Sequence, residues 1–190
     1  MGISPYFEFL KGLFDVSEEK LNQIAEILVE TSISERSIWV VGNGGSASTA
    51  EHFETDLSFI RKGNAFPKSR VSALTSNSAL ISAIANDTGY ENIFSQQLFR
   101  KADPGDLCIL ISASGNSENL INAAIACKEI GLKTIGLLGF DGGKLAGLVD
   151  SSIIVNTEIG KYGPVEDIHL AICHALSEIV GQKLASSGTL

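Results

Sequence analysis

Hydrophobic and polar residues follow two different periods along this chain, and the first is helical. From residue 6 to residue 32, apolar positions recur about every 3.6 residues, as in an amphipathic helix. The polar stretch Asp15–Ser17 interrupts this pattern, and the acidic pair after Ser17 is typical of a helix start. The sequence therefore predicts a broken N-terminal helical segment. Its expected buried positions are Leu10, Leu13, Phe14, Leu21, Ile24, Ile27 and Leu28.

Short, continuous apolar runs come next, and helical patterns separate them. The predicted strands are Ser37–Val41, Arg70–Thr75, Leu107–Ser112, Lys133–Leu138 and Ser152–Val155. The predicted helices are Ser46–Ile60, Ser78–Ala85, Ile93–Lys101, Ser117–Ile130, Gly142–Leu148 and Pro164–Ala185. Strands that are apolar on both faces and alternate with helices form a parallel sheet covered on both sides. We therefore expect a three-layer α/β/α fold, with Arg61–Lys68 as a surface loop.

Composition fits one globular domain over residues 1–190. Hydrophobic residues make up 44% and charged residues 19% of the chain, enough apolar surface for a core. The net charge of −8 argues against general nucleic-acid binding, which requires a basic face. The three cysteines lie inside apolar runs and are expected to be reduced thiols of a cytoplasmic protein. No apolar segment has the length of a membrane span, so we expect no membrane partner.

Two of the predicted strands end in loops rich in glycine and serine, and a helix follows each loop. These loops are Gly42-Asn43-Gly44-Gly45-Ser46 and Ser112-Ala113-Ser114-Gly115-Asn116-Ser117. Backbone N–H groups, hydroxyls and the positive end of a helix dipole together bind anions. In a parallel sheet both loops lie at the carboxyl edge, where ligands bind. We therefore expect one phosphorylated ligand between the two loops.

Nucleotides fit these loops poorly. The first loop formally matches a dinucleotide fingerprint, but no acid ends the second strand, where Leu74, Thr75 and Ser76 stand. The Gly-Lys-Ser/Thr sequence of a triphosphate loop is missing as well. A tight turn that serves packing alone would explain one loop of this kind, but it explains two hydroxyl-rich loops poorly. Phosphate binding is therefore the favoured interpretation. In the second loop, helix capping alone accounts for Ser117, so Ser112 and Ser114 are the stronger ligand candidates.

The three histidines lie on two predicted helices, together with two acidic residues. His52 and Asp56 are four residues apart and share a helix face. On the last helix Glu166 lies about 80° from His174, whereas His169 lies about 140° from His174, so the two histidines cannot easily share a site. A set made of His52, Asp56, Glu166 and His174 would suit Zn²⁺ or another divalent ion. Surface or capping roles explain the same spacing equally well.

Four motifs, in order, resemble the sugar isomerase (SIS) domain, and within it the phosphoheptose isomerases, which interconvert sedoheptulose 7-phosphate and a heptose phosphate. By themselves the second and fourth motifs are typical of turns. The resemblance extends from about residue 20 to about residue 180. The motifs are Gly42-Asn43-Gly44-Gly45-Ser46 with His52-Phe53, Ala85-Asn86-Asp87-x-Gly89-Tyr90, Ser112-x-Ser114-Gly115-Asn116-Ser117 and Asp141-Gly142-Gly143-Lys144-Leu145-Ala146-Gly147.

The resemblance implies a flavodoxin-like, five-stranded parallel sheet with extra N-terminal helices, in a single SIS domain over residues 1–190. It also implies a homotetramer with active sites at subunit contacts. Because the N-terminal helices carry more apolar positions than the sheet needs, we expect residues 1–35 to pack in that oligomer. The implied substrate contacts are Asn43, Gly44, Gly45, Ser46, Asn86, Asp87, Ser112, Ala113, Ser114, Ser117 and Glu166.

Carried onto this chain, the family's zinc ligands fall on His52, Asp56, Glu166 and His174, with one zinc per subunit and Asp56 and His174 as the acid/base pair. Asp56 stands where the family has glutamate, and Glu166 where it has glutamine. Aspartate is one methylene shorter, which withdraws the carboxylate by about 1.5 Å and affects proton transfer. The added negative charge of Glu166 should strengthen the binding of a cation. Asp56 cannot easily be a tight ligand and a free base at once.

The resemblance implies an aldose–ketose isomerase that works through an enediol, most simply on sedoheptulose 7-phosphate. Two alternatives stay open. A branch of the same fold binds the replication initiator protein without catalysis, and this chain would then be a phosphosugar-binding or partner-binding module. The substrate would otherwise be a different sugar phosphate. The retained His52 and His174 argue against a non-catalytic module, whereas the two departures argue for it.

Overall fold

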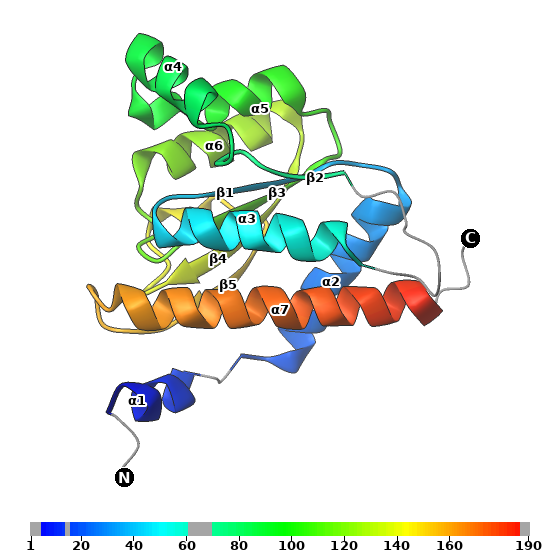
Figure 1. Cartoon of the computed structure of the whole chain (residues 1–190), viewed down its shortest axis with the longest axis vertical. Helices are drawn as coiled ribbons and strands as arrows, with labels where there is room; N and C mark the ends of the chain where they lie inside the picture. The colour runs from blue at the N-terminus through cyan, green and yellow to red at the C-terminus, as the bar shows by residue number, and fades with distance from the viewer. Residues whose placement is uncertain (1–4, 14–15, 61–69, 187–190) are drawn as a thin grey trace.

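The sheet is built from five parallel strands in the order β2-β1-β3-β4-β5 (Figure 1). The structure, a computed structural model, describes residues 5–13, 16–60 and 70–186. This strand order is that of flavodoxin-like folds, so the expected fold class is confirmed. The strands are β1 (Ile38–Gly42), β2 (Val71–Ala73), β3 (Leu107–Ser112), β4 (Lys133–Gly139) and β5 (Ser151–Val155).

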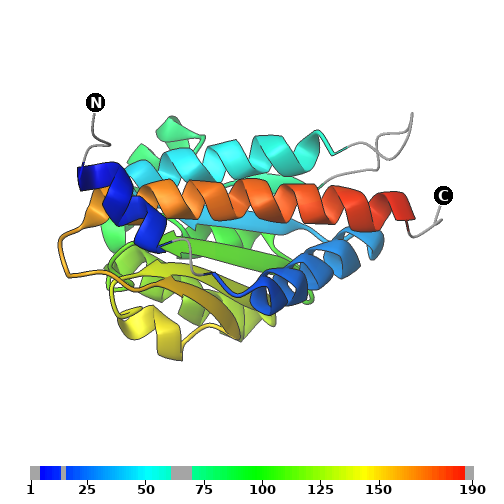
Figure 2. The ribbon, with the colours of Figure 1, turned by 90° about the horizontal axis from the view of Figure 1, so that it is seen from below.

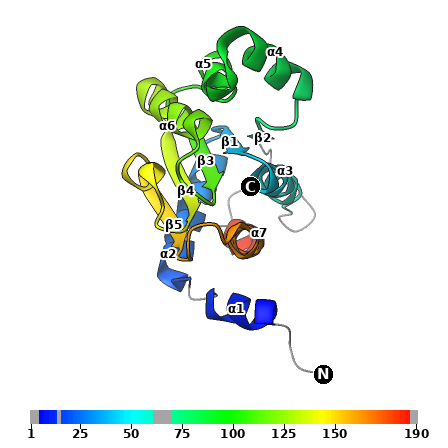
Figure 3. The same cartoon turned by 90° about the vertical axis from the view of Figure 1, so that its left-hand side faces the viewer.

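Helices cover both faces of the sheet, as the end-on view shows (Figure 3). One face carries α2 (Glu18–Ile33), α3 (Gly45–Ser58) and α7 (Tyr162–Ser186). The other face carries α4 (Ser78–Thr88), α5 (Ser95–Lys101) and α6 (Glu118–Ile130), with the 3₁₀ helices η1 (Tyr90–Asn92) and η2 (Lys144–Gly147). The remaining helix, α1 (Pro5–Leu13), lies beside the first half of α7 (Figure 2).

Each strand supplies side chains to two separate hydrophobic cores. In β1, Ile38 and Val40 pack toward α2, α3 and α7, whereas Trp39 and Val41 pack toward α5 and α6. Because both faces are covered, every residue of β1 is buried. The continuous apolar runs in the sequence have this physical origin. Among the described helices, none is long and apolar enough to cross a membrane.

The N-terminal segment is broken where the sequence predicts. Ser17 caps α2, and its hydroxyl accepts a hydrogen bond from the Lys20 N–H at 3.4 Å. Of the expected buried positions, Ile24 and Leu28 are buried. The half-buried ones are Leu10, Leu13, Leu21 and Ile27, and Phe14 lies outside the described residues, as does the expected loop Arg61–Lys68.

One predicted helix is wrong. The sequence predicts a helix over Gly142–Leu148, but only the four-residue 3₁₀ helix η2 forms there. Gly142 and Gly143 have φ angles of 86° and 54°, in the left-handed region, so they form a turn that an α-helix does not allow. The predicted limits of the five strands differ from the observed ones by at most two residues.

Asp106 fixes the amino ends of β1 and β3. Its side chain is buried and accepts hydrogen bonds from the Ser37 N–H at 2.9 Å, the Trp39 indole N–H at 3.0 Å and the Asp103 N–H at 3.0 Å. Three donors from two neighbouring segments therefore depend on one carboxylate.

We expect Asp106→Ala to lower the free energy of unfolding by about 3 kcal/mol, because three donors lose their acceptor. Urea unfolding followed by circular dichroism measures this change. The matched control is Asp103→Ala, which removes an exposed carboxylate and leaves the backbone bonds intact. A loss equal to that of the control would contradict the role given to Asp106.

Candidate functional site

The first glycine-rich loop brings the start of α3 close to the end of β1. A Cβ at Gly42 would collide with the backbone of Ser46, so only glycine allows this close approach. Gly44 has a φ of 54° and is the N-cap residue of α3. Ser46 is buried in the first turn of the helix. The N-terminal end of α3, with its partial positive charge, thus lies at the carboxyl edge of the sheet.

The second loop uses its hydroxyls differently from the sequence-based expectation. The Ser112 hydroxyl accepts a hydrogen bond from the Gly115 N–H at 3.0 Å, and the Ser114 hydroxyl accepts one from the Asn116 N–H at 3.3 Å. Ser117 is the N-cap residue of α6, but its side chain makes no capping hydrogen bond to that helix. The view that capping accounts for Ser117 is therefore wrong. The hydroxyls of Ser112 and Ser114 thus hold the loop in shape. The Ser117 hydroxyl makes no capping hydrogen bond to α6.

The fourth motif supports this loop. A Cβ at Gly115 would collide with the carbonyl oxygen of Gly142, so the two turns lie in direct contact. The Lys144 N–H donates to Asn116 Oδ1 at 3.1 Å, and the Leu145 N–H donates to the Gly115 carbonyl at 3.0 Å. The motif that begins at Asp141 thus fixes the shape of the serine-rich loop.

Both loops and the start of α7 enclose a cavity of about 100 Å³. One water needs about 10–15 Å³ of cavity volume, so the cavity has room for a small polyatomic group. Seven expected substrate contacts line it: Asn43, Ser46, Ser112, Ala113, Ser114, Ser117 and Glu166. Sequence reasoning missed Ile111, Leu120 and Tyr162, which also line it. Gly44 and Gly45 lie in the adjacent turn.

Asn86 and Asp87 lie outside this cavity. Both are exposed near the end of α4, and the Asn86 amide donates to Asp87 Oδ1 at 2.9 Å. Asp87 lines a separate groove between α4 and α5. From the same motif it is Tyr90 that reaches the first loop, where its hydroxyl donates to Asn43 Oδ1 at 3.1 Å. In this chain, Tyr90 therefore connects the motif to the first loop.

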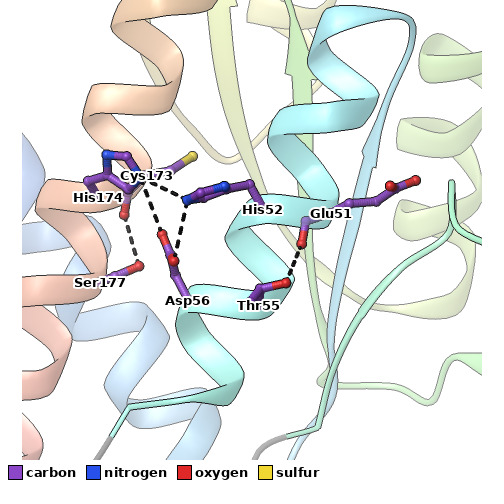
Figure 4. A network of polar contacts seen from close by, with 7 residues as sticks. All are labelled: Glu51, His52, Thr55, Asp56, Cys173, His174 and Ser177. Atoms are coloured by element: carbon purple, nitrogen blue, oxygen red, sulfur yellow. Dashed lines mark hydrogen bonds and ion pairs between the residues drawn. The ribbon is translucent and has the colours of Figure 1, made fainter.

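A second cluster forms where α3 packs against α7 (Figure 4). The Nε2 atoms of His52 and His174 lie 2.9 Å apart. Asp56 faces both rings, with Oδ1 3.5 Å from His52 Nε2 and Oδ2 3.7 Å from His174 Nε2. The shared helix face of His52 and Asp56 is therefore confirmed.

This cluster has the properties of a cation site. One ligand atom from each of His52, Asp56 and His174 lies within 4.8 Å of the others. Asp56 Oδ2 is buried and has no hydrogen-bond partner among the residues that the structure describes. An imidazole nitrogen without a proton and a carboxylate oxygen each have a lone pair that can bind a cation. Nitrogen and oxygen donors of this kind fit Zn²⁺ or a similar divalent ion.

Glu166 does not join this cluster in the same subunit. It precedes His174 by eight residues, which is roughly 12 Å along the axis of α7. A Cβ at Gly45 would collide with the Glu166 carboxylate, which places that carboxylate at the start of α3. Glu166 thus belongs to the serine-lined cavity of its own chain.

His169 lies in the core and apart from both groups. It is fully buried, and its Nε2 donates to the Leu138 carbonyl at 3.0 Å, whereas Nδ1 has no partner among the described residues. The expectation that His169 and His174 do not share a site is confirmed. Burial in this apolar surrounding lowers the pKa of His169 to about 4.

Known proteins are similar to this chain in sequence and fold. Residues 6–139 match the family model described as the SIS domain. The phosphoheptose isomerase of Aliarcobacter butzleri is 35% identical over 178 residues, covering 94% of this chain and 93% of that protein. The phosphoheptose isomerase of Helicobacter pylori strain P12 is 37% identical, with 94% and 91% covered. The solved structure of phosphoheptose isomerase from Neisseria gonorrhoeae has 29% identity and a TM-score of 0.82, with 93% of each chain covered.

The chain belongs to the SIS domain family, the class that its sheet order and serine-rich loops define. Within that family it belongs with the phosphoheptose isomerases, which are aldose–ketose isomerases. The resemblance found in the sequence is therefore confirmed.

The low pKa of His169 predicts a loss of stability in acid. The folded state binds the proton of His169 less tightly than the unfolded state, whose histidine pKa is about 6.5. The contribution of neutral His169 to the free energy of unfolding is therefore complete above pH 6.5 and falls as the pH drops toward 4. Between about pH 7 and about pH 4.5 we expect protonation of His169 to lower the free energy of unfolding by about 2–3 kcal/mol. Urea unfolding at both pH values should show a smaller loss for His169→Gln, which does not titrate. Equal losses in both proteins would contradict this prediction.

Proposed function

We propose that the protein converts sedoheptulose 7-phosphate into D-glycero-D-manno-heptose 7-phosphate through an enediol. The observation that carries the proposal is the meeting of His52, Asp56 and His174 between α3 and α7, two helices that also border the serine-lined cavity. A phosphate grip and a set of proton-transfer groups are what an isomerase of phosphosugars requires. The relationship to phosphoheptose isomerases supports this choice of substrate.

The serine-lined cavity is proposed to hold the phosphate. It combines the Ser46 and Ser117 hydroxyls with the N-terminal ends of α3 and α6, which favour an anion. Its volume of about 100 Å³ suits the phosphate group alone, so the sugar would extend out of it. Asn86 and Asp87 lie outside the cavity of their own subunit, which supports a contact with the sugar of a neighbouring subunit.

Asp56 and His174 are proposed to move the protons. A carboxylate oxygen of Asp56 takes the proton from C1 of the ketose, and the electron pair of that C–H bond becomes the C1=C2 bond. The former carbonyl oxygen on C2 receives a proton from His174. In the second half, His174 takes the proton from the oxygen on C1, and the proton held by Asp56 is delivered to C2. The enzyme groups therefore end in the protonation states in which they began.

Zn²⁺ is the proposed metal, held by His52, Asp56 and His174 in one subunit. When bound, a divalent ion would polarise the carbonyl and hydroxyl oxygens as a Lewis acid. The buried Oδ2 atom of Asp56, which lacks a hydrogen bond among the described residues, supports this assignment. Asp56 and His174 each carry two candidate roles, and in any one state each acts either as a metal ligand or as a proton-transfer group.

The position of Glu166 supports a site shared between subunits. Since Glu166 lies roughly 12 Å along α7 from His174, the four-residue ligand set cannot close on one ion within one chain. Another subunit's Glu166 would complete it, which requires at least a dimer, and we propose the homotetramer that the sequence resemblance implies. The exposed aromatic residues of α1 offer an apolar surface for such a contact. They are Tyr6, Phe7 and Phe9.

A different sugar phosphate is the second candidate substrate. Tyr162 and Glu166 line the mouth of the phosphate cavity, and such side chains select the sugar that extends past them. The assembled cluster of His52, Asp56 and His174 speaks against a non-catalytic regulator. Three buried, unpaired thiols support our proposal that the protein works in the reducing cytoplasm.

We expect wild-type protein supplied with Zn²⁺ to isomerise sedoheptulose 7-phosphate, and His174→Ala to lower kcat at least about 100-fold, because proton transfer by a placed group contributes that much. Phosphosugar binding, measured by calorimetry, should persist in the variant. Ser177→Ala is the matched control, since Ser177 lies about one turn after His174 on α7 and its hydroxyl donates to the Cys173 carbonyl (Figure 4). Full turnover in His174→Ala would contradict the assignment, and a wild-type protein that binds but never turns over would favour a binding module.

A shared site predicts rescue between two inactive variants. Glu166→Ala and His174→Ala, each inactive alone, should form mixed oligomers in which roughly a quarter of the sites combine intact residues from two subunits. Co-expression with two different tags, followed by tandem purification, isolates these oligomers for an activity assay. If the tandem-purified mixed oligomers have no activity, the proposal of a site shared between subunits is wrong.

A further inference from the structure

We propose that Asn119 is a positioning residue that fixes the distance between the two phosphate-binding loops. The proposal rests on the proposed function, because it concerns the same serine-lined cavity. Asn119 itself does not line that cavity, and neither loop motif in the sequence includes it.

Asn119 and Asn43 form a reciprocal pair of amide hydrogen bonds. The Asn43 Nδ2 donates to Asn119 Oδ1 at 2.9 Å, and the Asn119 Nδ2 donates to Asn43 Oδ1 at 2.8 Å. Asn119 is only 2% exposed, so water does not compete for these bonds. Two parallel bonds between planar groups restrict both the separation and the relative orientation of their segments.

This pair lies where the sheet no longer holds the two segments. The last register pair between β1 and β3 is Gly42 with Ile111, and the two loops leave the sheet directly after it. Asn43 is the next residue of the first loop, and Asn119 lies two residues after Ser117, the N-cap of α6. The amide pair thus continues the cross-connection between neighbouring strands into the loops that carry the serines.

A third segment joins the same amide. The Tyr90 hydroxyl in η1 donates to Asn43 Oδ1 at 3.1 Å, so this oxygen accepts two hydrogen bonds. Asn43 lines the cavity, and with its oxygen and one N–H already used it can offer a ligand only its second N–H. Asn43 therefore meets the substrate as a donor, in an orientation that Asn119 and Tyr90 set.

The test measures substrate affinity and turnover separately. We expect Asn119→Ala to raise KM and the calorimetric Kd for sedoheptulose 7-phosphate about tenfold, with kcat changed less than about threefold, because the loss of two bonds loosens the binding loops and not the proton-transfer groups. Tyr90→Phe, which removes one exposed hydroxyl, should raise both constants about threefold. The matched control is Asn22→Ala. That residue lies on α2, and its amide donates to the Glu18 carbonyl of the same helix.

A double-mutant cycle gives the second readout. If Asn119 acts through Asn43, the double variant Asn43→Ala/Asn119→Ala should bind no more weakly than the weaker single variant. The positioning role would be overturned by an unchanged Kd in both Asn119→Ala and Tyr90→Phe. It would also be overturned if the losses of binding free energy in the two single variants add up in the double variant. An unfolded Asn119→Ala leaves Tyr90→Phe to decide. Wild-type protein that binds the phosphosugar without turnover would refute the proposed function alone, and wild-type protein that does not bind it would refute both.

Discussion

The pairing of β1 with β3 is the constraint on which the rest of the structure depends. These strands lie next to each other although α3, β2, α4, η1 and α5 come between them in the chain. Their register joins Ile38 with Leu107 at one end and Gly42 with Ile111 at the other. As a result, both loops leave the same edge of the sheet side by side, with the N-terminal ends of α3 and α6 beside them. The two walls of the serine-lined cavity that these loops form follow from this strand pairing, and the start of α7 completes it.

The histidine cluster depends on a second contact, between α3 and α7. Both helices start at the carboxyl edge and cover the same face, so residues at similar depth along them meet. His52 and His174 meet in this way, with Asp56 one turn further along α3. The hydrophobic face of each helix fixes its rotation, because residues such as Phe53 and Cys173 are fully buried. Core packing therefore aims the polar side chains at one another.

The parts of the fold that depend on local pattern could be predicted from the sequence. The five strands, the break before α2 and the pairing of His52 with Asp56 each follow from periods or caps within a few residues. The position of Glu166 could not be predicted in this way. An angle of about 80° puts Glu166 near the helix face of His174, but the axial rise over eight residues separates the two side chains along α7. Asn119 and Tyr162 left no local signal, since only tertiary contacts bring them to the loops.

Charge balance would connect the two departures from the family pattern, at positions 56 and 166, that the sequence resemblance implies. Within one subunit the cluster offers one carboxylate and two imidazoles, which leaves a divalent ion with one uncompensated positive charge. A second carboxylate at position 166, contributed in the proposed shared site by another subunit, would neutralise that charge where glutamine would not. A shorter acid at position 56 is held by two histidines and is a weaker candidate for reaching the substrate. In the proposed shared site, the two carboxylates of Asp56 and Glu166 would therefore strengthen retention of the metal ion, whereas the shorter side chain of Asp56 would reduce its reach toward the substrate.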